Sequence, residues 1–186
     1  MTKNILISLK YLLVSIIIFG VFYTLFITGI GYVFFRDKIN GSVIEKDGVV
    51  IGSSLIAQKF QDPKFFHPRP SACDYGTMPS SASNYGALNP ELKKEVDSRI
   101  KELGADAPAE LLFTSGSGLD PHIRPATALF QIDRILTARA LPVSERSKLV
   151  DLIKEHTEKP QLRFLGPNRV NVLELNLAME KVFNGK

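Results

Sequence analysis

The chain has 186 residues, 45% of them hydrophobic, with 23 lysines and arginines against 19 aspartates and glutamates. The positive excess is small and no dense run of lysine and arginine occurs, which argues against a nucleic-acid-binding protein. The single cysteine, Cys73, excludes an intramolecular disulfide and a cysteine-based zinc site.

An uninterrupted apolar segment comes first. Between Tyr11 and Phe35, 25 consecutive residues carry no charge. A helix of that length reaches about 37 Å, which exceeds the ~30 Å hydrocarbon core of a bilayer. The segment ends in bulky residues and not at a small-residue cleavage site, which favours an uncleaved anchor over a signal peptide. We therefore predict a short basic cytoplasmic tail (1–10), a transmembrane helix (11–35) and a globular domain (36–186).

Small residues recur along one face of the predicted anchor. Gly20, Thr24 and Thr28 are four residues apart, and Gly31 lies close to the same face. Such a face lets another helix approach closely, so these residues are candidates for packing against a partner in the membrane. Glycine and threonine are also ordinary in spanning helices, so the pattern alone does not require a partner.

Basic residues flank the anchor on both sides and do not fix its orientation. Lys3 and Lys10 precede it, while Arg36, Lys38 and Lys46 follow it. Because a long following domain crosses the membrane regardless of its charge, we prefer a cytoplasmic N-terminus and an extracytoplasmic globular domain.

The globular domain begins with a predicted hairpin. β-Branched residues alternate on both sides of Asp47-Gly48, a dipeptide favoured in tight turns. The segment 62–90 is rich in proline, glycine, serine and asparagine, which predicts irregular structure. Its aromatic residues favour an ordered surface over a flexible linker.

A well-delimited helix is predicted from Pro90 to Leu103. Asn89 is its expected N-cap, and Gly104 lies just past its end. The expected buried stripe of this helix consists of Leu92, Val96, Ile100 and Leu103.

In the second half of the domain, the sequence pattern predicts a strand at 110–115, a helix over 125–141 and a third helix over 144–158 that begins at Ser144. Apolar spacing places side chains of both helices in the core, namely Leu129, Ile132, Ile135, Leu136, Leu149, Val150 and Ile153. The end of the chain, 162–177, is read either as strand or as strand followed by helix. Hairpins and helices without regular βαβ alternation indicate one mixed α+β domain behind a single N-terminal transmembrane helix.

The stretch TSGSGLDPHIRP, residues 114–125, admits three interpretations: a phosphate-binding loop, a catalytic Ser/Asp/His cluster, or a turn. A Walker-type loop needs a lysine and a hydroxyl after its last glycine, where this chain has Leu119 and Asp120. A hydrolase built on Ser117, Asp120 and His122 lacks the GxSxG nucleophile elbow. The SGSG stretch has a loose likeness to the LSGGQ signature of ABC transporters. A structural or interface role is favoured over catalysis.

Arg69 lies between two prolines, so its backbone is stiff and its guanidinium is presented in a defined direction. It is a candidate for docking to an acidic partner surface, and a salt bridge that braces its own loop is the alternative. The three histidines lack the spacing of a helical metal site, and we interpret them as structural: His67, His122 and His156.

Several blocks of the sequence occur together in one known family. In chain order they are the basic tail with its single span, GSSLIAQKFQDPKFFHPRPSA, SNYGALNPEL, TSGSGLDPHI, HTE and RVNVLELNLAM. With these blocks the chain resembles, over nearly its whole length, the C subunit (KdpC) of the Kdp potassium-transporting P-type ATPase.

The resemblance implies an accessory, non-catalytic subunit rather than an enzyme, in the inner or plasma membrane of a prokaryote. Its implied partners are a potassium-channel-like subunit, a P-type ATPase subunit and a small single-span subunit. The family resemblance further implies a role in assembly of the potassium uptake complex, and as a catalytic chaperone that raises the affinity of the ATPase subunit for ATP.

ATP is therefore the expected cofactor of the complex, and two routes to it stay open. With the domain inside the cell, the candidate direct ATP contacts are Ser115, Gly116, Ser117, Gly118 and Gln131. With the domain outside, these residues do not reach cytoplasmic ATP, and the effect is a coupling free energy transmitted through the span and the partner subunits.

Overall fold

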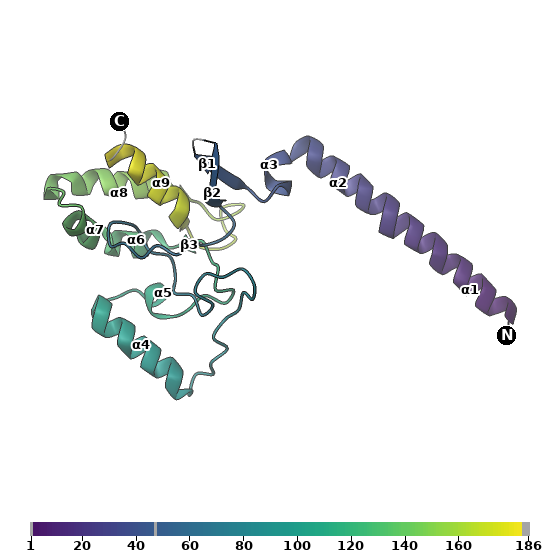
Figure 1. Ribbon diagram of the computed structural model, residues 1–186, viewed down its shortest axis with the longest axis horizontal. Coiled ribbons are helices and arrows are strands. Elements are labelled where there is room, and N and C mark those ends of the chain that lie inside the picture. Colours follow the sequence, from purple (N-terminus) through teal and green to yellow (C-terminus); the bar gives the residue numbers. More distant parts are fainter. Residues whose placement is uncertain (1, 47, 184–186) are drawn as a thin grey trace. The chain divides into compact units, whose positions relative to one another are not determined.

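The computed structural model describes residues 2–46 and 48–183, and the chain divides into two compact units, Met1–Ile51 and Gly52–Lys186. The first unit is dominated by one apolar helix of 33 residues, long enough to cross a membrane, in which no residue is buried (Figure 1). It consists of α1 (Thr2–Ser15), the π-helical stretch η1 (Ile16–Phe22) and α2 (Tyr23–Phe34). The predicted apolar segment is therefore helical, and the same helix includes the tail.

After the long helix the chain turns back. Phe35 leaves the helical conformation with φ −137°, and the single turn α3 (Arg36–Ile39) follows. Next, β1 (Val43–Lys46) and β2 (Val49–Ser53) pair in a two-stranded sheet, which confirms the predicted strands. Asp47 of the expected turn lies outside the described residues.

The second unit starts with the predicted irregular segment. Neither helix nor strand occurs between residues 54 and 89 of the described chain. The helix α4 (Pro90–Leu103) then begins at the predicted cap, because Asn89 Oδ1 accepts a hydrogen bond from the Glu91 N–H at 2.9 Å. Gly104, with φ 97°, ends it.

The apolar stripe of α4 is only half buried, which corrects the prediction that it belongs to the core. The helix packs chiefly against α5 (Ala109–Leu112), a single turn, and therefore contributes little to the main core.

Three short strands and five helical segments complete the unit between residues 122 and 183. In chain order they are β3 (His122–Ile123), α6 (Pro125–Phe130), α7 (Ile132–Ala138), η2 (Val143–Glu145), α8 (Arg146–Glu155), β4 (Thr157–Glu158), β5 (Arg169–Asn171) and α9 (Val172–Phe183). The strands form an antiparallel sheet in the order β3-β5-β4, with Val170 opposite both Ile123 and Thr157. The α+β class is confirmed.

The core of this unit lies between α6, α7, α8, α9 and the central strand β5. Its most deeply buried side chains are Phe66, Ile123, Ile132, Ile135, Leu149, Ile153, Val170, Leu175 and Met179. All but one of these side chains belong to the helices and the sheet. Phe66, which comes from the irregular segment, is 0% exposed, so this segment is packed onto the core and is not a loose loop.

Two predicted elements were wrong in type or extent. The expected strand at 110–115 begins as the helical turn α5, which buries Leu111 and Leu112. Its Glu110 accepts hydrogen bonds from the Arg124 N–H at 2.8 Å and the Thr127 hydroxyl at 2.7 Å, and so caps α6 from outside. The expected helix over 125–141 is broken into α6 and α7, which leaves the predicted core residue Leu129 38% exposed.

The third predicted helix, 144–158, starts later and ends earlier than expected, because α8 ends at Glu155 and the predicted last residues form the strand β4. The 3₁₀ turn η2 precedes α8, and Ser144 makes no capping hydrogen bond. Leu149 and Ile153 are buried as predicted, whereas Val150 is half buried. At the chain end, 169–177 is strand followed by helix, while 162–166 is a loop.

Two buried amide side chains hold the irregular segment onto the core. Asn176 Oδ1 accepts a hydrogen bond from the Phe66 N–H at 2.8 Å, and Asn176 Nδ2 donates to the Phe66 carbonyl at 2.9 Å. In the same way, Gln131 Oε1 accepts a hydrogen bond from the His67 N–H at 2.8 Å, and Gln131 Nε2 donates to the His67 carbonyl at 3.0 Å. Because buried backbone groups require partners, these two amides replace the pairing that a strand would have supplied.

Replacing Asn176 with leucine keeps the branched shape and the number of side-chain heavy atoms but leaves the Phe66 N–H and carbonyl unpaired in the core. We expect the free energy of unfolding to fall by about 2–5 kcal/mol, since each unsatisfied buried group costs roughly 1–3 kcal/mol. Urea denaturation of the full chain in mild detergent, followed by near-ultraviolet circular dichroism, measures the loss. The matched control, Asn168→Leu at an exposed position, should stay within about 0.5 kcal/mol of the parent; equal midpoints for the two variants would contradict this role.

Candidate functional site

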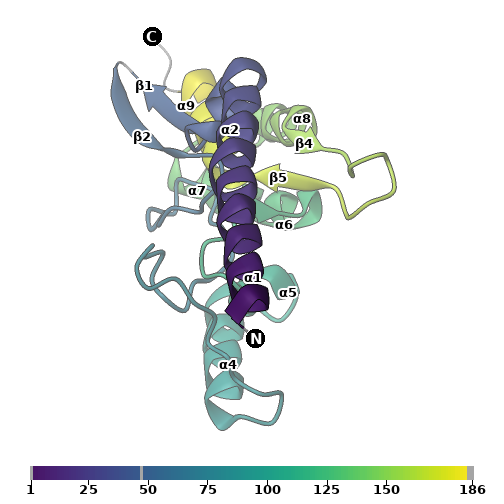
Figure 2. The same cartoon turned by 90° about the vertical axis from the view of Figure 1, so that its right-hand side faces the viewer.

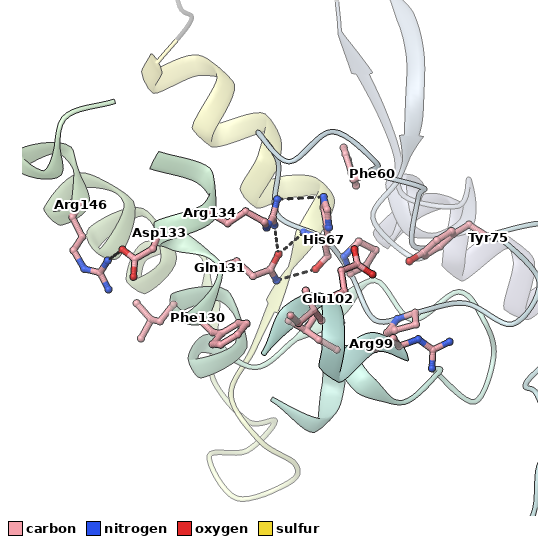
Figure 3. A pocket seen from close by; sticks show the side chains of 15 residues that line it. Phe60, His67, Tyr75, Arg99, Glu102, Phe130, Gln131, Asp133, Arg134 and Arg146 are labelled. Carbon is pink, nitrogen blue, oxygen red and sulfur yellow. Dashed lines mark hydrogen bonds and ion pairs between the residues drawn. The ribbon is translucent and has the colours of Figure 1, made fainter. Parts of the chain in front are cut away.

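A cavity of about 700 Å³ lies between the irregular segment, α4 and the pair α6–α7 (Figure 3). Its charged and aromatic lining consists of Phe60, His67, Tyr75, Arg99, Glu102, Phe130, Asp133, Arg134 and Arg146. Gln131, one of the candidate ATP contacts, also lines it. The cavity thus combines three arginines and two carboxylates with aromatic rings.

Arg134 braces the wall of this cavity. Its guanidinium donates to the carbonyl of Phe65 at 2.9 Å and to Gln131 Oε1 at 2.7 Å. It also lies 3.4 Å from His67 Nε2. Burial, and secondly the positive charge of Arg134, hold the pKa of His67 below its usual value. His67 is therefore uncharged at neutral pH and does not compete with Arg134 for an anion.

The other two arginines of the wall are also held by the protein. Arg99 donates to the Leu112 carbonyl at 2.7 Å and to Glu95 at 3.0 Å. Arg146 forms an ion pair with Asp133. These bonds fix the directions of the guanidinium groups, so the cavity presents three preorganised arginines together with the carboxylates of Glu102 and Asp133.

Tyr75 contributes a neutral hydroxyl. Its Oη donates to the Arg69 carbonyl at 2.9 Å, and burial raises the pKa of Tyr75 to about 12. The hydroxyl thus stays protonated throughout the physiological range.

The predicted Ser/Gly loop does not line the cavity. Ser115 is 1% exposed, and its N–H donates to the Pro70 carbonyl at 2.9 Å. The Ser117 hydroxyl accepts from the Leu119 N–H at 3.1 Å, an ordinary local turn contact, and Gly116 is exposed. The loop and Gln131 hold neighbouring parts of the same irregular segment, but they do not face one shared cavity.

The residues of the hydrolase interpretation come together only in part. Asp120 Oδ1 accepts from the His122 N–H at 3.0 Å and lies 3.8 Å from His122 Nδ1. Within the described chain, no hydrogen bond joins Ser117 to His122, and burial lowers the pKa of His122. This arrangement supports a turn rather than a nucleophile with its base.

Arg69, the candidate docking residue, forms an internal ion pair. Its guanidinium lies 3.3 Å from Asp120 Oδ2 and donates to the Thr114 carbonyl at 3.3 Å. The bonds tie the irregular segment to the Ser/Gly loop, which favours the loop-bracing alternative.

The small residues of the anchor remain on an open helix, with one exception. Thr24 Oγ1 donates to the Phe19 carbonyl at 3.4 Å, and both Gly20 and Thr28 are exposed. A Cβ on Gly31 would lie 2.9 Å from Ile39 Cγ2, so this glycine accommodates the chain's own turn α3. Gly20, Thr24 and Thr28 are therefore the part of the predicted face that stays exposed.

Comparison with known proteins decides the family. The family described as KdpC: K+-transporting ATPase, c chain, matches residues 5–181. The chain belongs to the KdpC family. A relative named potassium-transporting ATPase KdpC subunit, from Methylococcus capsulatus, is 46% identical over 93% of this chain and 95% of its own length. Proteins of the same name from Koribacter versatilis and Pseudomonas aeruginosa are 41% and 44% identical, over 97% and 96% of this chain and 95% and 97% of their own lengths.

Sequence reasoning selects only Gln131 among the cavity residues of this KdpC-family chain and misses its arginines. Arg134 had a sequence signal, because it lies between Ile132 and Ile135, two residues predicted to be in the core, where a charge needs partners. Arg99 and Arg146 look like ordinary surface charges of helices, and only the tertiary arrangement brings them together.

Adding a methyl group at Gly118 should disrupt the Ser/Gly loop, whereas the same change at Gly116 should not. Gly118 has φ 72°, and a Cβ there would collide with Cys73 Sγ and lie 2.8 Å from the Ser81 carbonyl oxygen. We expect Gly118→Ala to lower the free energy of unfolding by about 1–3 kcal/mol. Around Gly116 no atom lies within 4 Å of the added carbon, so Gly116→Ala is the matched control. Thermal melts of both variants in detergent test the difference, and an unchanged Gly118→Ala would show that the loop is not tightly packed.

Proposed function

We propose that this KdpC-family chain is an accessory, non-catalytic subunit of a potassium-transporting ATPase complex, required for assembly and acting as a catalytic chaperone for the ATPase subunit. The supporting observation is the 33-residue apolar helix Thr2–Phe34, of which no residue is buried within its own unit. Lipid and other membrane-spanning helices match such a surface.

The partners we propose are a potassium-channel-like subunit, a P-type ATPase subunit and a small single-span subunit, in a prokaryotic cell membrane. The N-terminus lies inside and the globular domain outside in this proposal. The exposed face of Gly20, Thr24 and Thr28 is the proposed contact with a partner helix, because small side chains allow two backbones to approach closely.

Replacing Thr24 with leucine adds bulk to this face and should weaken the complex. We expect less of the other subunits to co-purify with the Thr24→Leu chain in detergent, by about five- to tenfold for a loss of roughly 1 kcal/mol or more. Val33→Leu is the control, since Val33 is 72% exposed and lies on the opposite side of the same helix. Equal recovery from both variants would remove Thr24 from the contact.

The alternative is a subunit that binds the nucleotide directly, and the cavity gives it a specific observation. Gln131 lines it together with three arginines and the rings of Phe60, Tyr75 and Phe130, a combination suited to phosphate and a planar base. The amide of Gln131 is already bonded to His67, so the arginines and the rings would supply the contacts. This route requires the domain to lie on the cytoplasmic side.

The side of the membrane on which Leu88 lies separates the two proposals. Leu88 is 98% exposed, whereas Cys73 is half buried, so the Leu88→Cys change in a Cys73→Ala background gives an accessible thiol. We expect a membrane-impermeant maleimide to label this chain in intact cells. Labelling only in inverted vesicles would contradict the external domain and leave direct nucleotide binding as the better proposal. The Cys73→Ala chain without the new cysteine gives the background signal.

A further inference from the structure

The loop between β4 and β5 holds three large apolar side chains in solvent. Leu162 is 75% exposed, Phe164 74% and Leu165 52%, and we call these three residues the apolar tip. Figure 2 shows the loop extending away from the sheet. Exposed apolar groups gathered in one place are typical of contact surfaces.

The loop has a defined turn structure that presents the apolar tip. The N–H groups of Phe164 and Leu165 both donate to the Gln161 carbonyl, at 3.2 and 2.9 Å, and Arg163 N–H donates to the Pro160 carbonyl at 2.9 Å. Leu162 has φ 52° and Arg163 has φ 69°, a left-handed conformation that branched and bulky residues seldom adopt. The fold thus maintains an unfavourable backbone conformation in the segment that exposes these side chains.

Positive charge surrounds a second cavity beside the apolar tip. This cavity, of about 510 Å³, is lined by Lys154, Thr157, Lys159, Pro160, Arg163 and Asn168, and by no carboxylate. Lys159 and Arg163 form no ion pair with any described residue. The nearby acids are engaged, since Asp151 lies 3.0 Å from Lys154 and Glu158 lies 2.8 Å from Arg169.

We propose that this loop docks onto the lipid surface of the membrane in which the chain is anchored. The apolar tip enters the boundary between headgroups and acyl chains, and the basic cavity binds the phosphate of an anionic phospholipid. Leucine and phenylalanine next to lysine and arginine is the composition of interfacial membrane contacts. A soluble phosphate would account for the cations but not for the apolar tip.

Because the anchor tethers the domain to the membrane, the loop between β4 and β5 can dock even if its own affinity for lipid is modest. Gly52, the first residue of the second unit, follows Phe34 by 18 residues, which span at most about 60 Å when fully extended. Tethering keeps the local concentration of lipid around the domain high, so a few favourable groups suffice to hold the loop at the surface.

The absence of tryptophan from the chain provides a clean test. We would place the full-length Phe164→Trp variant in nanodiscs with brominated acyl chains, which quench indole fluorescence on contact. The matched control is Leu88→Trp, at a position that is 98% exposed on another part of the unit. In discs rich in phosphatidylglycerol we expect blue-shifted, quenched emission from Phe164→Trp and unquenched emission from the control.

The charge of the lipid and of the loop should both alter the result. Each lysine or arginine near an anionic surface changes the ratio of docked to undocked domain by about fivefold, so Lys159→Gln with Arg163→Gln should lower it by about 25-fold. Phosphatidylcholine discs should likewise reduce quenching. Quenching equal to that of the Leu88→Trp control would overturn the proposal. A blue shift without quenching, seen only when the other subunits are present, would also overturn the proposal. It would show that the apolar tip contacts a partner protein and not lipid.

Discussion

Four hydrogen bonds from two side-chain amides determine how the globular domain is built. Asn176 and Gln131 pair with the backbone of Phe66 and His67, two consecutive residues of a segment that has neither helix nor strand. Phe66 can fill the core only because its own polar backbone is satisfied there. A long irregular segment thereby becomes a fixed part of the domain, although it lacks the hydrogen-bonding ladder of a sheet.

The same contacts shape the candidate site. His67 forms part of the cavity wall, and Gln131 also accepts a bond from Arg134, so this arginine of the cavity is linked directly to the segment that these amides hold. On the other side of the segment, Arg69 joins it to Asp120 beside the Ser/Gly loop. These contacts connect the cavity, the irregular segment and the Ser/Gly loop.

Local patterns predicted the elements that are determined locally. The long apolar helix, the hairpin strands and the helix bounded by Asn89 and Gly104 each carry their own signal of length, turn chemistry or capping. Two features depend on partners that are distant in the sequence and could not be predicted. The break between α6 and α7 at Gln131 involves its hydrogen bond with His67. The turn α5 involves the hydrogen bonds of Glu110 with Arg124 and Thr127. The cavity was missed for the same reason. Its arginines come from three helices, and the spacing of apolar residues within each helix does not show how the helices pack together.

The close approach of Gly118 to Cys73 has a chemical consequence for the thiol. There is no room for even one added carbon at Gly118 beside Cys73 Sγ, whose neighbours also include the Ser71 hydroxyl at 3.3 Å. The Ser/Gly loop therefore covers one side of the partly exposed Cys73 thiol, and any group attached to Sγ must extend away from Gly118.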